Sequence, residues 1–145
     1  MKITAKVPWK NTTGDIPMHL SYPQGTMYDS LEQIAKKYPQ NIAFDFMGRS
    51  VTYQKMINEI NTCAKALKTI GIREGDKVTI ALPNCPQAIY IFYAINLVGA
   101  IANMIHPLSA ENEIKYFFNL TKSEYVVAVD LNKKDYDSYY KISFF

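Results

Sequence analysis

The chain has 145 residues, of which 48% are hydrophobic and 20% charged, a composition typical of a globular domain with a buried core. Its net charge of +3 is spread along the sequence without a block of Lys and Arg, which argues against a nucleic-acid-binding protein. The two cysteines, Cys63 and Cys85, have no CxxC partner and no nearby His, which argues against a metal site.

Proline and glycine recur throughout the first 27 residues. They stand at Pro8, Gly14, Pro17, Pro23 and Gly25. This spacing excludes a long helix, so we predict an extended arm with turns over residues 1–27. The beginning of the sequence has no apolar segment of signal-peptide length, and together with two free cysteines this favours a cytoplasmic protein.

A short helix is predicted to follow the arm. The sequence from Ser30 to Gln33 has the form of a capping box, in which the Gln33 side chain reaches back to the first residue. The helix should end near Tyr38, because Pro39 disfavours helical backbone in the residue before it.

A β-hairpin and a long helix come next. Residues 42–46 are strand-like, Gly48-Arg49 is the expected turn, and Val51 begins the return strand. Thr52 is suited to cap a helix that ends at Gly71 in a left-handed conformation. The apolar side of that helix consists of Met56, Ile57, Ile60, Ala64 and Leu67.

The segment 88–105 is mostly apolar and about long enough to span a bilayer. Two asparagines interrupt it, and Gly99 stands where a helix would end. We therefore predict a core helix that starts at Pro86, followed by a strand over residues 100–105. The residues that suit a buried strand there are Ile101, Met104 and Ile105.

Strands and helices alternate from residue 51 to residue 130. Residues 78–82 form a continuous apolar run, as expected for a parallel strand buried on both faces, and residues 125–129 form the last strand. Between them Ser109 is predicted to cap a helix whose apolar side consists of Ile114, Phe117, Phe118 and Leu120. The pattern predicts an α/β fold, with a parallel-sheet layer and flanking helices in a subdomain over residues 28–130. Residues 131–145 break the pattern, and we expect them to be a truncated tail.

Residue chemistry alone predicts no active site. The six glycines are scattered, without a GxxxxGK[ST] or GxGxxG sequence, so nucleotide binding by this segment alone is not expected. His106 follows a strand, where α/β folds place ligands, but spacing identifies no acid or nucleophile beside it. A structural role and a catalytic role for His106 both stay open.

Five short motifs nevertheless occur in a characteristic order between about Ser30 and Asp130. They are Gly48-Arg49-Ser50-Val51-Thr52-Tyr53, Gly75-Asp76, Leu82-Pro83-Asn84, Gly99-Ala100 and His106-Pro107-Leu108. In this order the sequence resembles the opening third of an adenylate-forming acyl-CoA synthetase, although the family more often has Asn at the position of His106. The resemblance implies an incomplete part of the N-terminal domain of such a ligase.

The resemblance also implies a reaction. In the family a carboxylate attacks ATP, with Mg²⁺ bridging phosphates, and the thiol of CoA then displaces AMP. The ATP-binding motifs and the catalytic lysine of the family would lie beyond Phe145, so no catalytic residue is carried over and the fragment itself is expected to be inactive. In acetate-activating relatives the loop matching His106, Pro107 and Leu108 approaches the CoA nucleotide, which makes these residues candidate CoA contacts.

Three interpretations therefore follow from the sequence. The first is a truncated acyl-CoA ligase whose partner is the rest of the ligase chain. The second is a stand-alone binding or oligomerisation module that forms a homo-oligomer through an exposed sheet edge. The third, an amino-acid-adenylating domain, agrees less well with the sequence over residues 101–108. None of the three includes nucleic acid or a membrane span.

Overall fold

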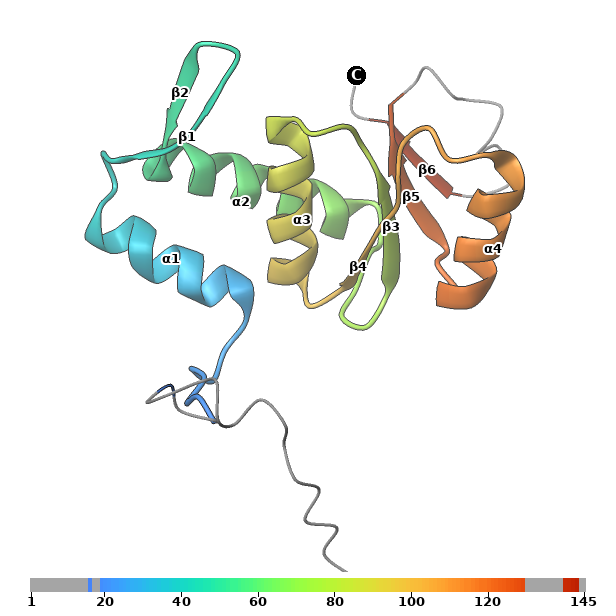
Figure 1. Cartoon of the computed structure of the whole chain (residues 1–145), viewed down its shortest axis with the longest axis horizontal. Coiled ribbons are helices and arrows are strands. Elements are labelled where there is room, and N and C mark those ends of the chain that lie inside the picture. The colour runs from blue at the N-terminus through green and yellow to red at the C-terminus, as the bar shows by residue number, and fades with distance from the viewer. Residues whose placement is uncertain (1–15, 17–18, 130–139, 144–145) are drawn as a thin grey trace, which may run out of the picture.

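The computed structural model describes residues 16, 19–129 and 140–143, the last range by its backbone (Figure 1). The elements are α1 (Met27–Lys37), β1 (Ile42–Phe46), β2 (Arg49–Thr52), α2 (Tyr53–Thr69), β3 (Lys77–Ala81), α3 (Pro86–Val98), β4 (Ile101–Met104), α4 (Glu111–Thr121), β5 (Tyr125–Ala128) and β6 (Tyr140–Ser143). Most of the predicted N-terminal arm lies outside the described residues. Its described part, residues 19–26, contains no helix or strand.

A parallel sheet with the strand order β4-β3-β5-β6 forms the centre of the molecule. Figure 1 shows α2 and α3 on one side of this sheet and α4 on the other. β3 lies between two other strands, and its residues Val78 to Ala81 are all buried, as the apolar run predicts. The predicted α/β fold class, a parallel sheet with helices on both faces, is confirmed.

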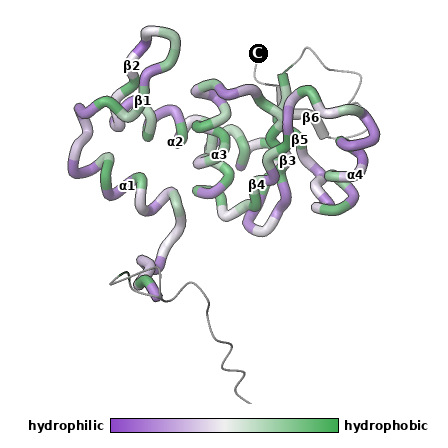
Figure 2. The backbone as a smooth tube through the Cα atoms, in the orientation of Figure 1, coloured by the Kyte–Doolittle hydropathy of each residue, from purple (hydrophilic) through white to green (hydrophobic). Residues whose placement is uncertain are grey.

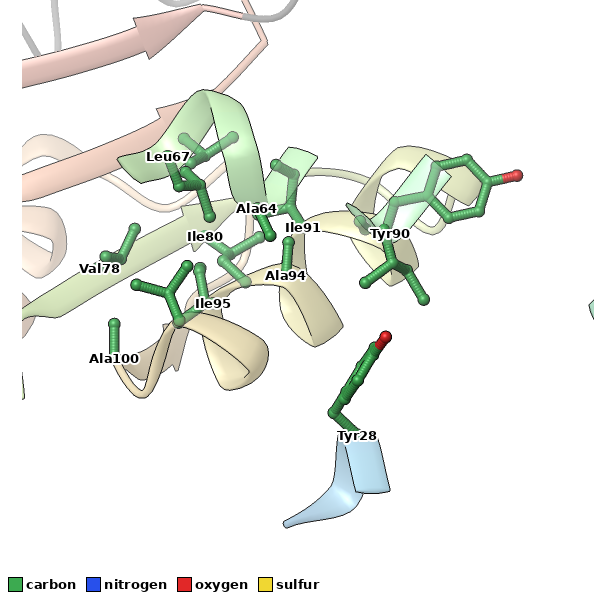
Figure 3. Close-up of a cluster of buried hydrophobic side chains, with 14 of the residues drawn as sticks. Tyr28, Ala64, Leu67, Val78, Ile80, Tyr90, Ile91, Ala94, Ile95 and Ala100 are labelled. Carbon is green, nitrogen blue, oxygen red and sulfur yellow. The ribbon is translucent and has the colours of Figure 1, made fainter. Parts of the chain in front are cut away.

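The larger core lies between the sheet and the helices α2 and α3. Ile80 and Val78 of β3 contact buried side chains of both helices, among them Leu67 and Ile95 (Figure 3). Figure 2 shows that α3 is mostly hydrophobic along its length, whereas α1 alternates between hydrophobic and hydrophilic residues. A smaller core on the opposite face joins Ile114 and Phe118 of α4 to the sheet.

The sheet face toward α4 also contains a polar contact. Thr79 of β3 is completely buried, and its Oγ1 accepts a hydrogen bond of 3.0 Å from Nδ2 of Asn103 on β4. The Oγ1 of Thr121, in the last turn of α4, lies 3.5 Å from the same Nδ2 and donates to the Phe117 carbonyl. The buried hydroxyl of Thr79 therefore has a partner, as a buried polar group requires.

The expected start of the first helix is wrong by four residues, because its cap is Thr26 and not Ser30. α1 begins after Thr26, whose Oγ1 accepts from the Asp29 N–H at 3.1 Å, while Asp29 Oδ2 accepts from the Thr26 N–H at 2.7 Å. Ser30 lies inside the helix. The earlier start brings Tyr28 into the helix and buries it against α2 and α3, a tertiary contact that local sequence does not reveal.

The predicted hairpin exists, with its turn one residue earlier than expected. Met47 and Gly48 both have positive φ angles, 48° and 78°, as in the two-residue turns whose twist matches that of paired strands. β2 therefore begins at Arg49 rather than at Val51. The cap at Thr52 is confirmed, because its Oγ1 accepts from the Lys55 N–H.

The expectation that residues 100–105 form a buried strand is wrong in part. The strand exists as β4, but Ile101 and Met104 are 53% and 58% exposed. β4 is the edge strand and pairs only with β3 among the described strands, so its side chains lack neighbours on the outer side. The division of the apolar segment 88–105 into a helix and a strand is confirmed, and no helix in the described part of the chain is long and apolar enough to cross a membrane.

The helix predicted after residue 109 needs two corrections. Its first cap is Ala110 rather than Ser109, because the Glu113 carboxylate accepts a hydrogen bond of 3.0 Å from the Ala110 N–H. Leu120 is 65% exposed, since two residues rotate it by about 200° around the helix axis from Phe118, which is buried.

The predicted tail contains a strand that the sequence did not indicate. β6 pairs in parallel with β5, with Tyr125 opposite Tyr140 and Ala128 opposite Ser143. Its alternating polar and apolar residues have no run as apolar as that of β3, because β6 lies at the second edge of the described sheet. Long-range pairing, rather than local sequence, determines this strand.

Candidate functional site

The described strands of the central sheet are parallel, so the segments that follow β3 and β4 leave the sheet at the same end, beyond the carboxyl ends of the strands. Residues 82–86 leave β3, residues 105–109 leave β4, and the Ile105 N–H donates to the Ile80 carbonyl at 3.0 Å. Open α/β sheets bind ligands beyond the carboxyl ends of their strands, where the strand order reverses. The structure places His106, Pro107 and Leu108 directly after the carboxyl end of β4, and their role as ligand contacts stays a prediction.

His106, Pro107 and Leu108 form a β-turn with Ser109. The Ser109 N–H donates to the His106 carbonyl at 3.1 Å, and Pro107 occupies the first central position of the turn, which it favours. The Leu108 N–H donates to Nδ1 of His106 at 3.2 Å. Because Nδ1 is an acceptor here, the neutral ring carries its proton on Nε2. This geometry gives His106 a structural role as the residue that shapes the turn.

A hollow of about 450 Å³ adjoins the turn. It is lined by Met104, Ile105, His106, Leu108, Ser109, Glu113 and Phe117. Leu108 is 76% exposed at its rim. The charged group in the lining is the Glu113 carboxylate, and no Lys or Arg contributes to it. A carboxylate without a cation disfavours a phosphate, so the hollow suits an uncharged group better than a nucleotide.

A second, more apolar hollow of about 480 Å³ lies between β1, α3 and β4. Its lining includes Phe44, Phe46, Ile89, Phe92, Tyr93 and Met104, together with the thiol-bearing residue Cys85 before α3. The sequence does not reveal this hollow, because its residues come from three separated segments. One feature of the sequence does point to it: the run from Ile89 to Tyr93 places apolar side chains on both sides of α3.

The glycines of the described residues do not form a phosphate loop. Gly48, Gly71, Gly75 and Gly99 all have φ angles between 78° and 100°, and each lies at a separate turn. The described residues also contain no group of three His, Cys, Asp or Glu side chains arranged to hold a metal ion. These residues therefore do not fit Mg²⁺ and a triphosphate.

Cys63 lies in a third hollow, of about 390 Å³, between α2 and α3. Burial raises the pKa of the Cys63 thiol above its ordinary value, and the nearby Glu59 carboxylate raises it further. A thiol with a raised pKa is a poor nucleophile at neutral pH, because the reactive form is the thiolate. Cys63 is half-buried and packs against the larger core.

The family model described as "AMP-binding enzyme" matches residues 31–141. The chain belongs to this family. The match covers most of the sequence and confirms the resemblance seen in the five motifs.

Two curated relatives illustrate the match. The long-chain-fatty-acid–CoA ligase of Bacillus subtilis (strain 168) is 30% identical over 125 residues, which are 86% of this chain and 22% of that ligase. An acetyl-coenzyme A synthetase of Dictyostelium discoideum is 33% identical over 98 residues, which are 63% of this chain and 14% of the synthetase. The chain thus spans about a fifth or less of the length of these relatives.

Solved structures show the same fold. The artificially fused adenylation-PCP di-domain NpsA-ThdA from Klebsiella oxytoca has a TM-score of 0.79 at 20% identity, covering 84% of this chain and 23% of that one. The O-succinylbenzoate coenzyme A synthetase MenE from Bacillus subtilis, in complex with AMP, has a TM-score of 0.76 at 22% identity, covering 82% and 31%. The described elements therefore have the same fold as part of these two proteins.

Proposed function

We propose that this AMP-binding enzyme is the N-terminal part of an ATP-dependent acyl-CoA ligase of the cytoplasm, acting in fatty acid metabolism. The observation that carries this proposal is the similarity to the Bacillus subtilis long-chain-fatty-acid–CoA ligase over 86% of the chain. Several acetyl-coenzyme A synthetases also match, and their names state the same product class. Two free cysteines suit the reducing cytoplasm.

The proposed reaction has two steps. A carboxylate oxygen of the acid forms a bond to the α-phosphorus of ATP, the bond to pyrophosphate breaks, and an acyl-adenylate results. The sulfur of CoA then attacks the acyl carbon, the bond to AMP breaks, and the thiol proton passes to solvent or a base. Such reactions depend on positioning and on neutralising charge at the phosphorus.

The 145-residue chain is proposed to contribute scaffold rather than chemistry. Its described residues offer neither a phosphate loop nor a cluster of metal ligands, and it covers 22% of the ligase that it resembles. ATP, Mg²⁺ and CoA are therefore proposed as cofactors of the longer enzyme. By itself the chain is expected to form no acyl-adenylate.

The turn formed by His106, Pro107 and Leu108 is proposed as a contact for CoA. The adjoining hollow is lined by Leu108, Phe117 and the Glu113 carboxylate, without a cation. The uncharged pantetheine arm of CoA suits this lining better than the phosphates do. Replacing Leu108 by Ser should therefore raise KM for CoA and for free pantetheine by a similar factor.

A chimera tests the ligase function. The matched stretch of this chain replaces its counterpart in the Bacillus subtilis ligase, and the acid-dependent release of pyrophosphate is measured with fatty acids, acetate and amino acids. Release with fatty acids and transfer to CoA support the proposal, and Leu108→Ser is assayed in the same protein. Release with amino acids alone would instead favour an amino-acid-adenylating domain.

Thermal unfolding of the isolated chain tests the scaffold role. A ligand that binds only the folded form raises the unfolding midpoint by mass action. We expect no rise with MgATP. A rise with MgATP would contradict the scaffold role, because a triphosphate site would then be present in this chain.

A further inference from the structure

The hollow between α2 and α3 brings polar side chains from both helices to an apolar wall. Glu59 and Cys63 stand four residues apart on α2, and Gln87 and Tyr90 stand three apart on α3, so each pair lies on one face of its helix. Its volume of about 390 Å³ falls in the range of about 300–1,000 Å³ that small-molecule sites occupy. We call it the Glu59 hollow.

Tyr90 contributes a hydroxyl group that has no hydrogen-bond partner in the described part of the chain. The residue is only 9% exposed, and its ring packs against that of Phe44 with 6.2 Å between the centroids. Figure 3 shows the hydroxyl pointing away from the buried aliphatic side chains beside it. Buried tyrosine hydroxyls usually have a hydrogen-bond partner, so this one is available to a ligand.

The Glu59 carboxylate gives the hollow a negative charge. No Lys or Arg lines the hollow, and Glu59 belongs to neither of the two ion pairs among the described residues. Burial raises the pKa of the Cys63 thiol and of the Tyr90 hydroxyl, and the Glu59 carboxylate raises the pKa of both further. The surroundings of these two groups therefore disfavour a second negative charge and favour a positive one.

We propose that the Glu59 hollow binds a small organic amine in its protonated form, with an apolar body. An ammonium group has several N–H donors, which suit the Glu59 carboxylate, the Tyr90 hydroxyl and the amide oxygen of Gln87. The apolar body of the amine would contact aliphatic side chains such as Leu82 and Ile91.

Other classes of ligand suit the hollow less well. An acid or a phosphate would meet the Glu59 carboxylate without a cation to offset the repulsion. A metal ion requires several ligands, and the described residues contain no group of three side chains that could hold one. The hollow shares no lining residue with the turn at His106, so an amine site here is independent of the proposed ligase function.

Cys63 provides a measure of binding that does not depend on activity. Methyl methanethiosulfonate reacts with thiols and not with amines, so mass spectrometry can follow the modification of Cys63 while an amine is bound. With 2-phenylethylamine at about ten times its Kd, about one chain in eleven stays free, and modification of Cys63 should slow about tenfold. Cys85, which lies outside this hollow, should react at an unchanged rate.

A neutral probe and two substitutions separate charge from shape. Glu59→Gln should raise the Kd of 2-phenylethylamine about tenfold or more and change that of the isosteric 2-phenylethanol little, because only the amine forms a charge-assisted hydrogen bond. Tyr90→Phe should raise both Kd values about threefold. Glu124→Gln, at an exposed position after α4, is the matched control and should change neither.

Each variant is compared with itself, with and without the probe. This comparison is needed because Glu59→Gln changes the pKa of the Cys63 thiol and hence its rate without any ligand. Urea unfolding of each variant establishes that it is folded. If the isolated chain does not unfold cooperatively, the same measurements are made in the chimera with the Bacillus subtilis ligase.

Three results would overturn the inference. Protection by 2-phenylethylamine that survives Glu59→Gln unchanged would mean that the hollow accepts apolar molecules without selecting a charge. Stronger protection by the anionic 3-phenylpropanoate would mean a site for acids. The third result is a folded protein in which none of the three probes slows the modification of Cys63.

The amine site and the ligase function fail in different ways. Protection of Cys63 by the amine in a chimera that releases no pyrophosphate supports the amine site and contradicts the ligase function. Release of pyrophosphate with fatty acids, without protection of Cys63 by the amine, contradicts the amine site and leaves the ligase function intact.

Discussion

The backbone N–H of Tyr28 donates a hydrogen bond of 2.9 Å to Oδ1 of Asn96, a residue 68 positions later in the chain. Tyr28 lies in the first turn of α1, where backbone N–H groups have no partner within their own helix. Asn96 of α3 supplies that partner from a neighbouring helix. The Tyr28 hydroxyl donates to Oδ1 of Asn61 on α2 at 3.4 Å, so one residue connects three helices.

Replacing Asn96 by Ala should loosen α1. The Tyr28 N–H would lose its acceptor in a partly buried position, which costs about 1–2 kcal/mol of unfolding free energy. Urea unfolding measures the loss, and hydrogen exchange should show reduced protection along α1 rather than along β3. The control is Gln33→Ala, because Gln33 is an exposed polar residue of α1. An equal effect of both substitutions on the free energy of unfolding would contradict the prediction.

The capping box of α1 should make stability depend on pH. The pKa of Asp29 is lowered from its ordinary value of 3.8, first because the carboxylate accepts the Thr26 backbone N–H and second because it interacts with the Thr26 side chain. A lowered pKa contributes stability above the unfolded pKa, and this contribution is lost as pH falls through the folded pKa. Asp29→Asn should therefore unfold at a lower temperature than the parent at about pH 7, and the difference should shrink below pH 3.8.

Thr26→Ser is the matched control for the capping box, because a serine hydroxyl also accepts the Asp29 N–H. It should keep the pH dependence of the parent chain. A difference between Asp29→Asn and the parent that stays constant down to low pH would show that Asp29 does not act through its charge.

The thiol of Cys63 should titrate at high pH. Burial raises the pKa of Cys63 above 9.0, with a smaller contribution from Glu59. The rate of alkylation at Cys63 should therefore rise with pH to a midpoint above 9.0, and Glu59→Gln should lower that midpoint. Glu124→Gln, at an exposed position after α4, should leave it unchanged.

The raised pKa of the Cys63 thiol also makes the free energy of unfolding depend on pH. A raised folded-state pKa contributes stability below the unfolded pKa that is lost as pH rises through the folded pKa. Cys63→Ala should remove that part of the alkaline destabilisation. Identical alkaline profiles of the parent and Cys63→Ala would contradict the assignment.

Gly99→Ala should destabilise the end of α3. Gly99 has a φ angle of 85°, and an added Cβ would lie 3.0 Å from Cγ of Glu74. Left-handed backbone in a residue with a Cβ costs about 1–2 kcal/mol, and the crowding adds to this cost. Thermal and urea unfolding measure the effect.

Gly48 is the matched control for Gly99. Its φ angle is 78°, with nothing within 4 Å of the added Cβ, so Gly48→Ala should show the conformational cost alone. The excess cost of Gly99→Ala over Gly48→Ala should shrink when Glu74→Ala is introduced as well, because Cγ of Glu74 at 3.0 Å is removed while its Cβ at 3.3 Å stays. An excess that is unchanged in the double variant would have another origin than the contact with Cγ.

The helices and central strands could be predicted because their signals are local. Pro86 and Gly99 fix both ends of α3, Thr52 starts α2, and the apolar run of β3 indicates a strand buried on both faces. The chemistry of each of these residues acts within a few positions of the chain. The predicted start of α1 was wrong, because the helix begins after Thr26 and not at Ser30. Both residues can cap a helix, but the start at Thr26 buries Tyr28 between distant helices.

Edges of the sheet could not be predicted, because they depend on strand order. Apolar residues alone do not show whether a strand has one neighbour or two, so β4 with its exposed Met104 was expected to be buried. β6 was missed for the same reason. The turn at His106 follows β4, as the sequence indicates, and its contact with CoA stays a prediction. The apolar hollow between β1, α3 and β4 depends on three separated segments that only the fold brings together.

The buried contact between Thr79 and Asn103 selects one alignment of β3 and β4 over its neighbours. These residues are directly opposite each other, and Val78, Ile80 and Ala102 beside them are apolar, so hydrophobicity alone would tolerate a shift. Sliding β4 by one position would turn the Asn103 amide toward the apolar core of α2 and α3. It would leave the Thr79 hydroxyl buried without a partner, at a cost of about 2 kcal/mol or more. The amide of Asn103 thus favours the observed register of β3 and β4 over the neighbouring registers.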